Sequence, residues 1–440
     1  MKLLGCCRRS LLFLSIPVGA AFGVGRAWAG PLEDYVARPD SVFAWTAGES
    51  WPTNGATVQR IDLTSQQWRE HRWQHTLTVV RPARVRNPGL GFLFITGDGR
   101  GSRELGILAT VAERAGIIAA VVTRVPNQPL YDGRKEDALI AYTLDQYLKS
   151  KDPTWPLLFP MVKSAVRAMD AVQQFADRTH QQRITNWVVS GASKRGWTTW
   201  LTAAVDPRVA GIAPMVIDTL NMKAQTDWAE KVYGRQSEQI RDYTELGLVQ
   251  RSEEPDVAEL RGWIDPYSYR RRYTMPKLIL IGSNDPYWTV DSLRHYWQDL
   301  PPPKLLHQTP NAGHDLAGGK EALPTLAAFV QMIADGHPLP SVDWKIQNAD
   351  EATLSLEVNV PAKAVRLWTA ESPDRDFRND SWTSRPLQAR PGNTRAVARV
   401  ETPATGYRAF FGEVELTSPT GHDFKLSTEA RVTPDGVRKQ

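Results

Sequence analysis

Hydrophobic runs and amphipathic segments alternate along the chain from about residue 70 to residue 335. Short apolar runs predict buried strands at 75–82, 89–97, 116–125, 184–190, 209–218 and 277–283. Segments with apolar side chains at helical spacing predict helices at 104–116, 159–180, 194–206 and 290–300. Buried strands that alternate with amphipathic helices are typical of a parallel sheet covered on both faces. The pattern therefore predicts an α/β fold.

Two parts of the chain depart from this alternation. Residues 219–276, between two of the strands, are mostly polar with helical character. We interpret them as a helical cap inserted over the carboxyl ends of the strands, where α/β sheets bind ligands. Beyond the prolines at 338 and 340 the apolar period becomes two, as at Leu354, Leu356 and Val358. This predicts an α/β domain over residues 30–340 and a carboxyl-terminal β-sandwich over residues 341–440.

The first 29 residues are typical of a secretory signal peptide. Lys2, Arg8 and Arg9 precede an apolar core at 11–24, and Ala27-Trp28-Ala29 offers a cleavage site. The core is too short for a stable membrane span. The paired arginines also fit a twin-arginine signal, so two export routes stay open. The prediction is a periplasmic or secreted protein with no stable membrane span after signal removal.

Removing residues 1–29 changes the meaning of the composition. The formal charge of the chain is +5, and four basic residues with no acidic ones lie in this segment, so the remaining chain is nearly neutral. A nearly neutral chain gives no reason to expect nucleic acid as a partner. Both cysteines, Cys6 and Cys7, lie in the same segment, which leaves no disulfide or cysteine metal site. No metal or cofactor motif is found elsewhere, and none is expected.

The stretch "WVVSGASKRGW" places one serine between a predicted strand and a predicted helix. Gly191 allows a tight turn before Ser193, and the helix amino terminus favours developing negative charge. The backbone N–H of Lys194 is then a natural oxyanion donor. The common nucleophile motif has glycine two residues after the serine, but Arg195 stands there and Gly196 follows. The alternative is that Ser193 is only a helix N-cap.

An acid and a base follow this serine in the chain. Asp285 comes directly after the predicted strand at 277–283, and Asp218, at the end of the preceding strand, is the alternative acid. His314 lies in a glycine-containing loop after the last large strand. Ser, Asp, His is the chain order of the α/β-hydrolase triad, in which the acid orients a histidine base that activates the serine. We therefore expect Ser193, Asp285 and His314 to form a catalytic triad.

A glycine-rich loop follows the predicted strand at 89–97. Gly97 and Gly99 flank Asp98, and glycine allows backbone N–H groups to approach a substrate oxygen closely. We expect an N–H group near Asp98 to be the second oxyanion donor.

Several long blocks resemble the PhoPQ-activated pathogenicity-related protein family. They include "LEDYVARPDSVFAW", "RVPNQPL", "IAYTLDQYLKSKDPTWPLLFPMVKSAVRAMD", "GASKRGWTTWLTAAVDPRVAGIAPMVIDTLNM", "DPYSYRRR" and "PNAGHDL". The resemblance implies an exported α/β-hydrolase-like protein with a carboxyl-terminal β domain, and it places the family's nucleophile turn at 191–196, its acid at Asp285 and its histidine at His314. The turn also resembles that of glucuronoyl esterases, which implies that the Lys194 cation helps to hold the oxyanion.

The predicted function is an exported serine hydrolase that cleaves an ester or amide in a small-molecule or peptide substrate. One alternative is a secreted binding or signalling protein on a hydrolase scaffold, because the acidic Asp98 stands in the oxyanion loop. Another is a carbohydrate esterase. The cap at 219–276 would set the substrate, and Arg195 and the run at 270–272 would favour acidic groups.

Overall fold

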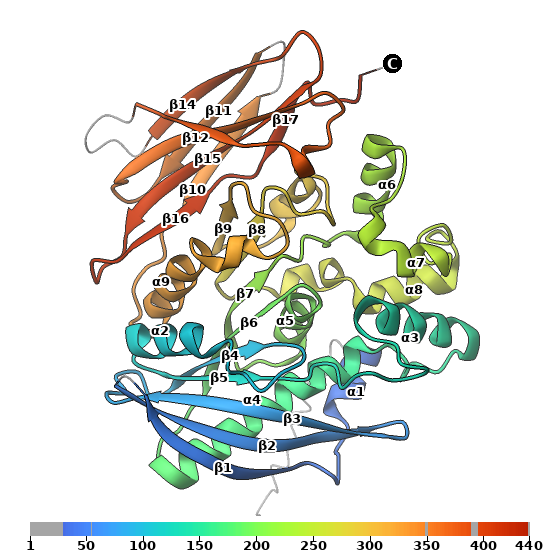
Figure 1. Ribbon diagram of the computed structural model, residues 1–440, viewed down its shortest axis with the longest axis vertical. Coiled ribbons are helices and arrows are strands. Elements are labelled where there is room, and N and C mark those ends of the chain that lie inside the picture. The colour runs from blue at the N-terminus through green and yellow to red at the C-terminus, as the bar shows by residue number, and fades with distance from the viewer. Residues whose placement is uncertain (1–29, 54, 348–350, 389–394, 439–440) are drawn as a thin grey trace, which may run out of the picture.

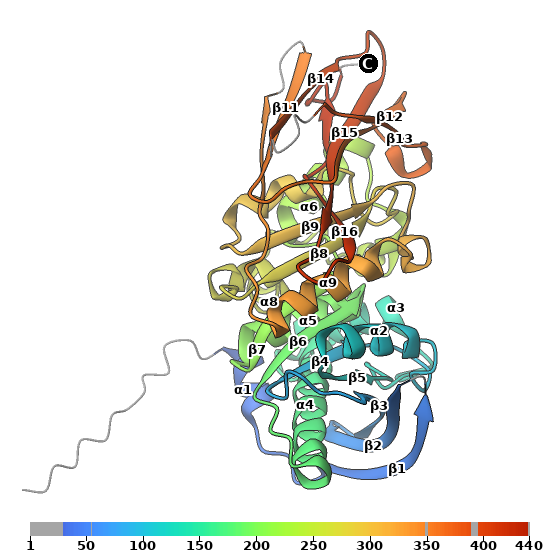
Figure 2. The ribbon, with the colours of Figure 1, turned by 90° about the vertical axis from the view of Figure 1, so that its left-hand side faces the viewer.

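The computed structural model of the protein describes residues 30–438 except residue 54, residues 348–350 and residues 389–394. The predicted signal peptide, residues 1–29, lies outside the described residues. The long axis of the molecule runs from the first strands of one large sheet to a group of carboxyl-terminal strands at the opposite end (Figures 1 and 2).

The large sheet has nine strands in the order β1-β2-β3-β5-β4-β6-β7-β8-β9. Neighbouring strands from β5 to β9 are parallel, whereas β1, β2 and β3 form an antiparallel extension at one edge. Every residue of β4, β5 and β8 is buried, which explains their mostly apolar sequences. The strands are β1 (Ala44–Thr53), β2 (Ala56–Trp68), β3 (His71–Pro82), β4 (Leu90–Ile95), β5 (Ile118–Val122), β6 (Asn186–Ala192), β7 (Val209–Met215), β8 (Lys277–Gly282) and β9 (Lys304–Thr309).

Helices cover both faces of this sheet, so two hydrophobic cores form. Leu93 and Ile95 of β4 point into one core, and Phe92 and Phe94, on the opposite face, point into the other. The first core is closed by α1 (Pro31–Ala37), α3 (Glu136–Ser150), α4 (Leu158–His180) and α5 (Lys194–Val205). The second is closed by α2 (Leu105–Ala115) and α9 (Ala322–Ala334). This strand order with helices on both faces is the predicted α/β-hydrolase fold.

The cap segment, residues 219–276, connects β7 to β8 and is helical. It contains α6 (Met222–Tyr233), η1 (Glu238–Ile240), α7 (Arg241–Glu245), α8 (Pro255–Ile264) and η2 (Pro266–Arg272). In Figure 1 α6, α7 and α8 lie together on the same side of the molecule as α3. The cap segment starts at the carboxyl end of β7, and its residues Met222 and Leu260 line a cavity together with Ser193, so it lies over that edge of the sheet.

The carboxyl-terminal strands form two antiparallel sheets. One has the order β10-β11-β14, and the other has β13-β12-β15-β16 with β17 paired to β15. Alternate residues of β11, including Leu354 and Leu356, are buried, as the period of two predicts. The strands are β10 (Val342–Gln347), β11 (Glu351–Val358), β12 (Ala364–Ser372), β13 (Thr383–Pro386), β14 (Arg395–Glu401), β15 (Tyr407–Thr417), β16 (Asp423–Ser427) and β17 (Arg431–Thr433).

The carboxyl-terminal strands are joined to the α/β layer by a shared core. Phe424 and Leu426 of β16 belong to the same buried cluster as Leu305 of β9 and Leu326 of α9. The backbone N–H of Gln308 donates to Ser427 Oγ over 2.9 Å. The two parts of the chain therefore pack as one body, although their sequences have different periods.

A second junction links the carboxyl-terminal strands to the cap segment. Arg375, in the β12–β13 connection, donates to the Asp291 carboxylate over 3.0 Å, and both side chains are at most 1% exposed. Trp228 of α6 donates to Asp291 Oδ1 over 3.0 Å, and its ring lies 4.9 Å from the Arg375 guanidinium and 4.6 Å from that of Arg294. Burial would raise the pKa of Asp291, but the charges of Arg375 and Arg294 hold it well below its ordinary value.

The structure differs from the sequence-based expectations in three places. Residues 290–300, predicted as an α-helix, form only the short 3-10 turns η3 (Ser292–His295) and η4 (Trp297–Asp299). Here Asp291 and Ser292 are held by buried polar contacts, which override helical spacing. The antiparallel strands β1 and β2 and helix α3 were not predicted. The residues of β1 are all exposed or only partly buried, and the buried positions of β2 and α3 are interspersed with polar residues.

Candidate active site

Ser193 occupies the sharp turn between β6 and α5. Its backbone angles are φ 59° and ψ −127°, a combination that residues other than glycine rarely adopt. Its side chain makes no capping hydrogen bond to α5, so the N-cap interpretation does not describe it. Backbone strain of this kind is typical of functional sites, where the surrounding structure enforces it.

Glycines on both sides of Ser193 allow this turn to pack closely. A Cβ atom on Gly191 would lie 2.8 Å from the carbonyl oxygen of Arg195. One on Gly196 would lie 2.7 Å from Ile217 Cγ2 and 2.9 Å from the carbonyl oxygen of Gly191. Close approach is therefore required at Gly191 and Gly196, which fits a glycine at the third position after the serine.

The structure brings Ser193, His314 and Asp285 together in one hydrogen-bonded chain. His314 Nε2 lies 2.8 Å from Ser193 Oγ, and His314 Nδ1 lies 2.8 Å from Asp285 Oδ2. Asp285 follows β8, and His314 lies in the loop that follows β9. The Asp285 side chain is 3% exposed and also accepts a hydrogen bond from the backbone N–H of Tyr287. Both ring nitrogens of the histidine are thus occupied by the other two members of the predicted triad.

The alternative acid, Asp218, has a different partner. Ser292 Oγ donates to its Oδ2 over 2.6 Å, and burial raises the pKa of Asp218 to about 6. Since His314 Nδ1 is bonded to Asp285, Asp218 is not the acid that orients the histidine in this structure.

The predicted oxyanion loop packs directly on the side chain of Arg195. A Cβ atom on Gly97 would lie 2.4 Å from Arg195 Nη2, so a larger residue here would have to displace the guanidinium. Gly99 has a φ of +125°, which also requires glycine. The Asp98 side chain is exposed, and its carboxylate accepts a hydrogen bond from Gln128 over 3.4 Å. The acidic side chain is therefore tied to Gln128, and the backbone remains the part of this loop suited to an oxyanion.

The two cations after Ser193 are both paired with carboxylates of α3. Arg195 donates to the two oxygens of Glu136 over 2.7 Å each. Burial alone would raise the pKa of Glu136, but the hydrogen bonds and charge of Arg195 lower it to about 2. Lys194 Nζ lies 2.8 Å from Asp137 and 3.1 Å from Glu136. Neither cation is unpaired, so the hypotheses that they bind an acidic substrate or the oxyanion lose their geometric basis.

The arginine run at 270–272 lies at the other end of α5. Arg272 Nη1 contacts the carboxylate of Glu33 over 2.5 Å and the carbonyl oxygen of Ala204 over 3.1 Å. Ala204 is eleven residues beyond Ser193, which corresponds to about 16 Å along a helix. The run therefore holds α1 against the end of α5 and does not face Ser193.

Sequence reasoning missed a tyrosine that contacts the histidine. The Tyr287 ring stacks on the His314 ring with a centroid distance of 4.4 Å and an interplanar angle of 29°. Its hydroxyl donates to Asp137 Oδ2 over 3.4 Å, and the hydroxyl of Tyr243 from α7 donates to Asp137 Oδ1 over 2.9 Å. Burial raises the pKa of both tyrosines, so they stay protonated donors. The place of Tyr287 two residues after Asp285 was the available sequence signal.

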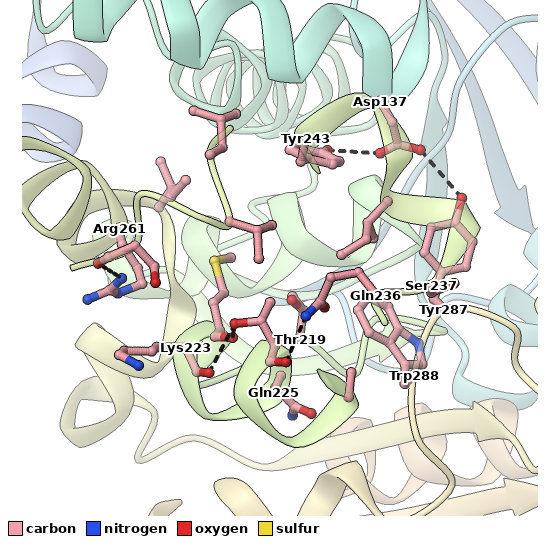
Figure 3. A pocket seen from close by; sticks show the side chains of 18 of the residues that line it. Asp137, Thr219, Lys223, Gln225, Gln236, Ser237, Tyr243, Arg261, Tyr287 and Trp288 are labelled. Carbon is pink, nitrogen blue, oxygen red and sulfur yellow. Dashed lines mark hydrogen bonds between the residues drawn. The ribbon is translucent and has the colours of Figure 1, made fainter. Parts of the chain in front are cut away.

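A cavity of about 180 Å³ opens beside Ser193 and extends under the cap segment (Figure 3). Asp137, Tyr243 and Tyr287 lie along one edge, and Lys223 and Gln225 lie along the opposite edge. In the part of the chain that the structure describes, no group of three His, Cys, Asp or Glu residues could hold a metal ion. Within the same residues no helix is long and apolar enough to cross a membrane.

The comparisons with known proteins agree with the sequence resemblance. The sequence model described as PhoPQ-activated pathogenicity-related protein matches residues 32–378. Autocrine proliferation repressor protein A of Dictyostelium discoideum is 32% identical over 460 residues, covering 94% of this chain and 92% of that protein.

Similar solved structures are more distant. An acetyl xylan esterase from Paenibacillus sp. R4 is 15% identical over 70% of this chain and 91% of its own, with a TM-score of 0.49. A glucuronoyl esterase from Solibacter usitatus is 13% identical over 68% of this chain and 91% of its own, with a TM-score of 0.40. Similarity this low carries no argument about activity. On the family match and the near full-length relative, the chain belongs to the PhoPQ-activated pathogenicity-related protein family.

Proposed function

We propose that this protein is a serine hydrolase that cleaves an ester or amide bond. The observation that carries the proposal is the chain of two 2.8 Å contacts from Ser193 Oγ through His314 to Asp285, built on a strained serine at the start of α5. A serine hydroxyl becomes an effective nucleophile when a base takes its proton and a third group orients that base. These three residues have the geometry for those roles.

In the proposed reaction His314 Nε2 takes the proton of Ser193 as Oγ attacks the carbonyl carbon. The imidazolium then gives this proton to the leaving alcohol or amine, and Asp285 stabilises the imidazolium through Nδ1–H. A water molecule deprotonated by His314 attacks the acyl-enzyme, and the released serine recovers its proton. This sequence consumes one water molecule and leaves the three side chains unchanged.

The negative charge on the carbonyl oxygen needs donors that are fixed before the reaction begins. We assign this role to the backbone N–H of Lys194, in the first turn of α5, and to a backbone N–H near Asp98, between Gly97 and Gly99. The first-turn N–H groups of a helix lack intrahelical partners and point toward the helix start. One such donor contributes about 3–4 kcal/mol to transition-state stabilisation.

The organisation of the chain is part of the proposal. Residues 1–29 are a signal peptide that directs export to the periplasm or the medium and is then removed. Residues 30–340 are the catalytic domain, with the cap segment inserted at 219–276, and residues 341–440 are the β-sandwich domain.

Labelling with a fluorophosphonate probe tests the proposal directly. The chain without residues 1–29 should be labelled at Ser193, and Ser193→Ala should lose both the label and any hydrolysis of short acyl esters. His314→Ala should fold normally and label far more slowly. A label of equal intensity on the Ser193→Ala protein would refute the assignment of the nucleophile.

A second candidate is a secreted signalling role, which the name of the Dictyostelium relative suggests for that protein. Near full-length similarity is the observation that favours it. If signalling alone is the function, wild type should resist the probe, and Ser193→Ala should be as active as wild type in repressing proliferation of the producing cells. The contact of His314 with Ser193 favours catalysis, because a degenerate site would not need it.

A further inference from the structure

The cavity beside Ser193 is enclosed by elements from four parts of the chain. Its lining comes from α3, from the turn that carries Ser193, from the cap segment and from the loop after Asp285. Most of the lining surface is apolar. The apolar side chains include Leu144, Ile217, Met222, Leu248, Val249 and Leu260.

The charged side chains in the lining already have partners within the protein. Asp137 accepts from Lys194, Tyr243 and Tyr287. Lys223 is paired with Asp227 and Glu253, and Arg261 donates to the carbonyl oxygen of Ser252. The charged side chains that could hydrogen-bond to a ligand with several hydroxyl groups are therefore already paired within the protein.

Two of the uncharged polar side chains are occupied as well, whereas Gln236 Oε1, Trp288 Nε1 and Thr289 Oγ1 are buried without a hydrogen-bond partner among the described residues. Gln225 donates to the carbonyl oxygens of Leu220 and Ser292, and Ser237 donates to that of Pro286. A wall whose surface is mainly apolar and whose charged groups are paired binds apolar surface by removing it from water.

We infer that this cavity binds an aliphatic or aromatic acyl chain, so that the substrate is an ester or amide of an apolar acid and not an acetylated sugar. The inference rests on the proposed function, because Ser193 forms part of the cavity wall. In an acyl-enzyme the acyl group is bonded to Ser193 Oγ, and its chain would extend into this cavity. Each methylene group buried there should raise the acylation rate about fourfold, which corresponds to about 0.8 kcal/mol.

Alkyl fluorophosphonates with a short and a long chain provide a matched pair of probes. The long-chain probe should label Ser193 at least about tenfold faster, as expected from burial of several methylene groups. Labelling by neither probe would refute the serine hydrolase proposal and this inference with it. Equal rates, or faster labelling by the short probe, would overturn only the inference about the cavity.

A variant that fills the cavity separates binding from general effects on activity. Ala229 lines the cavity from α6, whereas Lys231 on the same helix is exposed and does not line it. Ala229→Trp should slow labelling by the long probe at least about tenfold with little change for the short one, since only the long chain needs the filled space. Lys231→Trp should leave both rates unchanged. Equal slowing of both probes by Ala229→Trp would contradict an acyl-chain site. The same ratio should appear in hydrolysis of p-nitrophenyl octanoate and acetate.

A separate set of contacts assigns a role to the β12–β13 connection, which contains η6 (Phe377–Asn379). Asn284, immediately before Asp285, donates through Nδ2 to the carbonyl oxygens of Phe377 and Asp380 over 3.0 and 2.8 Å. Asn311, three residues before His314, donates to the carbonyl oxygen of Trp382 over 3.0 Å and accepts from its N–H over 2.7 Å. The same connection thus holds both loops that carry the acid and the base.

The two loops are also joined to each other. The backbone N–H of Asn284 donates to the carbonyl oxygen of Ala312 over 2.9 Å, and that of Asn311 donates to Ser283 Oγ over 2.9 Å. The geometry points to Asn284 and Asn311 as positioning residues, through which the β-sandwich sets the contact between Asp285 and His314. This second inference also rests on the proposed function.

Variants of the two asparagines test this role. Asn284→Ala and Asn311→Ala should lower kcat about tenfold to a hundredfold with little change in KM, because displacement of catalytic groups by less than 1 Å has effects of this size. The pH profile of kcat/KM should also change. Asn379→Ala, an exposed change in the same connection, is the matched control and should have no effect. Unchanged kcat and pH profiles in both asparagine variants would overturn the inference. A wild-type protein that the fluorophosphonate probe does not label would instead refute the hydrolase proposal.

Discussion

Replacing Asp291 by asparagine should destabilise the protein strongly, because it leaves a buried arginine without a counter-charge. Asp291 is 0% exposed and Arg375 is 1% exposed, and their charged atoms are 3.0 Å apart. At an effective dielectric constant near 20 this contact corresponds to about 5 kcal/mol of attraction. Arg294, the other arginine at Asp291, keeps a second carboxylate in Asp435, so the loss falls mainly on Arg375.

The expected loss in free energy of unfolding is about 3–5 kcal/mol, the cost of leaving one member of a buried pair unpaired. Asp435→Asn is the matched control, since the Asp435 side chain is 41% exposed and its removal should cost about 1 kcal/mol or less. Urea unfolding at pH 7, followed by tryptophan fluorescence and far-ultraviolet circular dichroism, measures both variants. Equal and small losses in the two variants would refute the electrostatic reasoning.

The pH dependence provides an independent check on the same pair. Because the folded protein holds the pKa of Asp291 below its ordinary 3.8, the carboxylate stabilises the fold fully above that value. This contribution is lost as the pH falls through the folded-state pKa. The stability difference between wild type and Asp291→Asn should therefore be constant from pH 7 to about pH 5 and shrink in stronger acid.

Three further changes test other parts of the structure. Gly196→Ala should lower the free energy of unfolding by about 1–3 kcal/mol through overpacking, and it should also reduce the rate of fluorophosphonate labelling. Calorimetry and labelling kinetics measure the two effects, and a fully stable and active variant would refute the argument that Gly196 is needed for close approach. Burial lowers the pKa of His75 and of His307 to about 4, so folding stability should fall as the pH drops from 6.5 toward 4, by up to about 3 kcal/mol for each residue. His75→Gln should make the stability measured by urea unfolding depend less on pH, and an unchanged pH dependence would contradict this reasoning. Tyr287→Ala should lower kcat about tenfold by removing the ring stacked on His314, whereas Tyr287→Phe should retain most activity; equal kcat values in the two variants would argue against stacking as the cause.

The sequence was sufficient to predict the α/β fold and the residues that meet at Ser193. This was possible because the carboxyl ends of parallel strands lie along one edge of a sheet, so a residue that directly follows a strand has a known place. Asp285 and His314 are such residues, and the order of the strands then brings them to Ser193. The roles of these three residues stay a proposal, whereas their proximity is a property of the structure.

Side-chain pairing over long distances in sequence could not be predicted. Arg195 was interpreted as a group available to substrate, but Glu136, on a helix 59 positions earlier, occupies it. The contact of Asn284 with Phe377 spans 93 positions and joins two regions with different hydrophobic periods. Hydrophobic periodicity reports which face of an element is buried, and it carries no information on which polar groups meet across elements. The prediction of a helix at 290–300 was wrong for the same reason, because polar contacts of Asp291 and Ser292 with other elements decide the structure there.

The β12–β13 connection has a consequence for how this chain can vary. Asn284 and Asn311 contact it through the carbonyl oxygens of Phe377, Asp380 and Trp382 and through one backbone N–H, never through its side chains. Backbone groups are the same in every amino acid except proline, so many substitutions would preserve these contacts. An insertion or deletion of a single residue would move all of them at once. The length of this connection should therefore be a property that a functional variant has to keep, in addition to its buried side chains Arg375, Phe377 and Trp382.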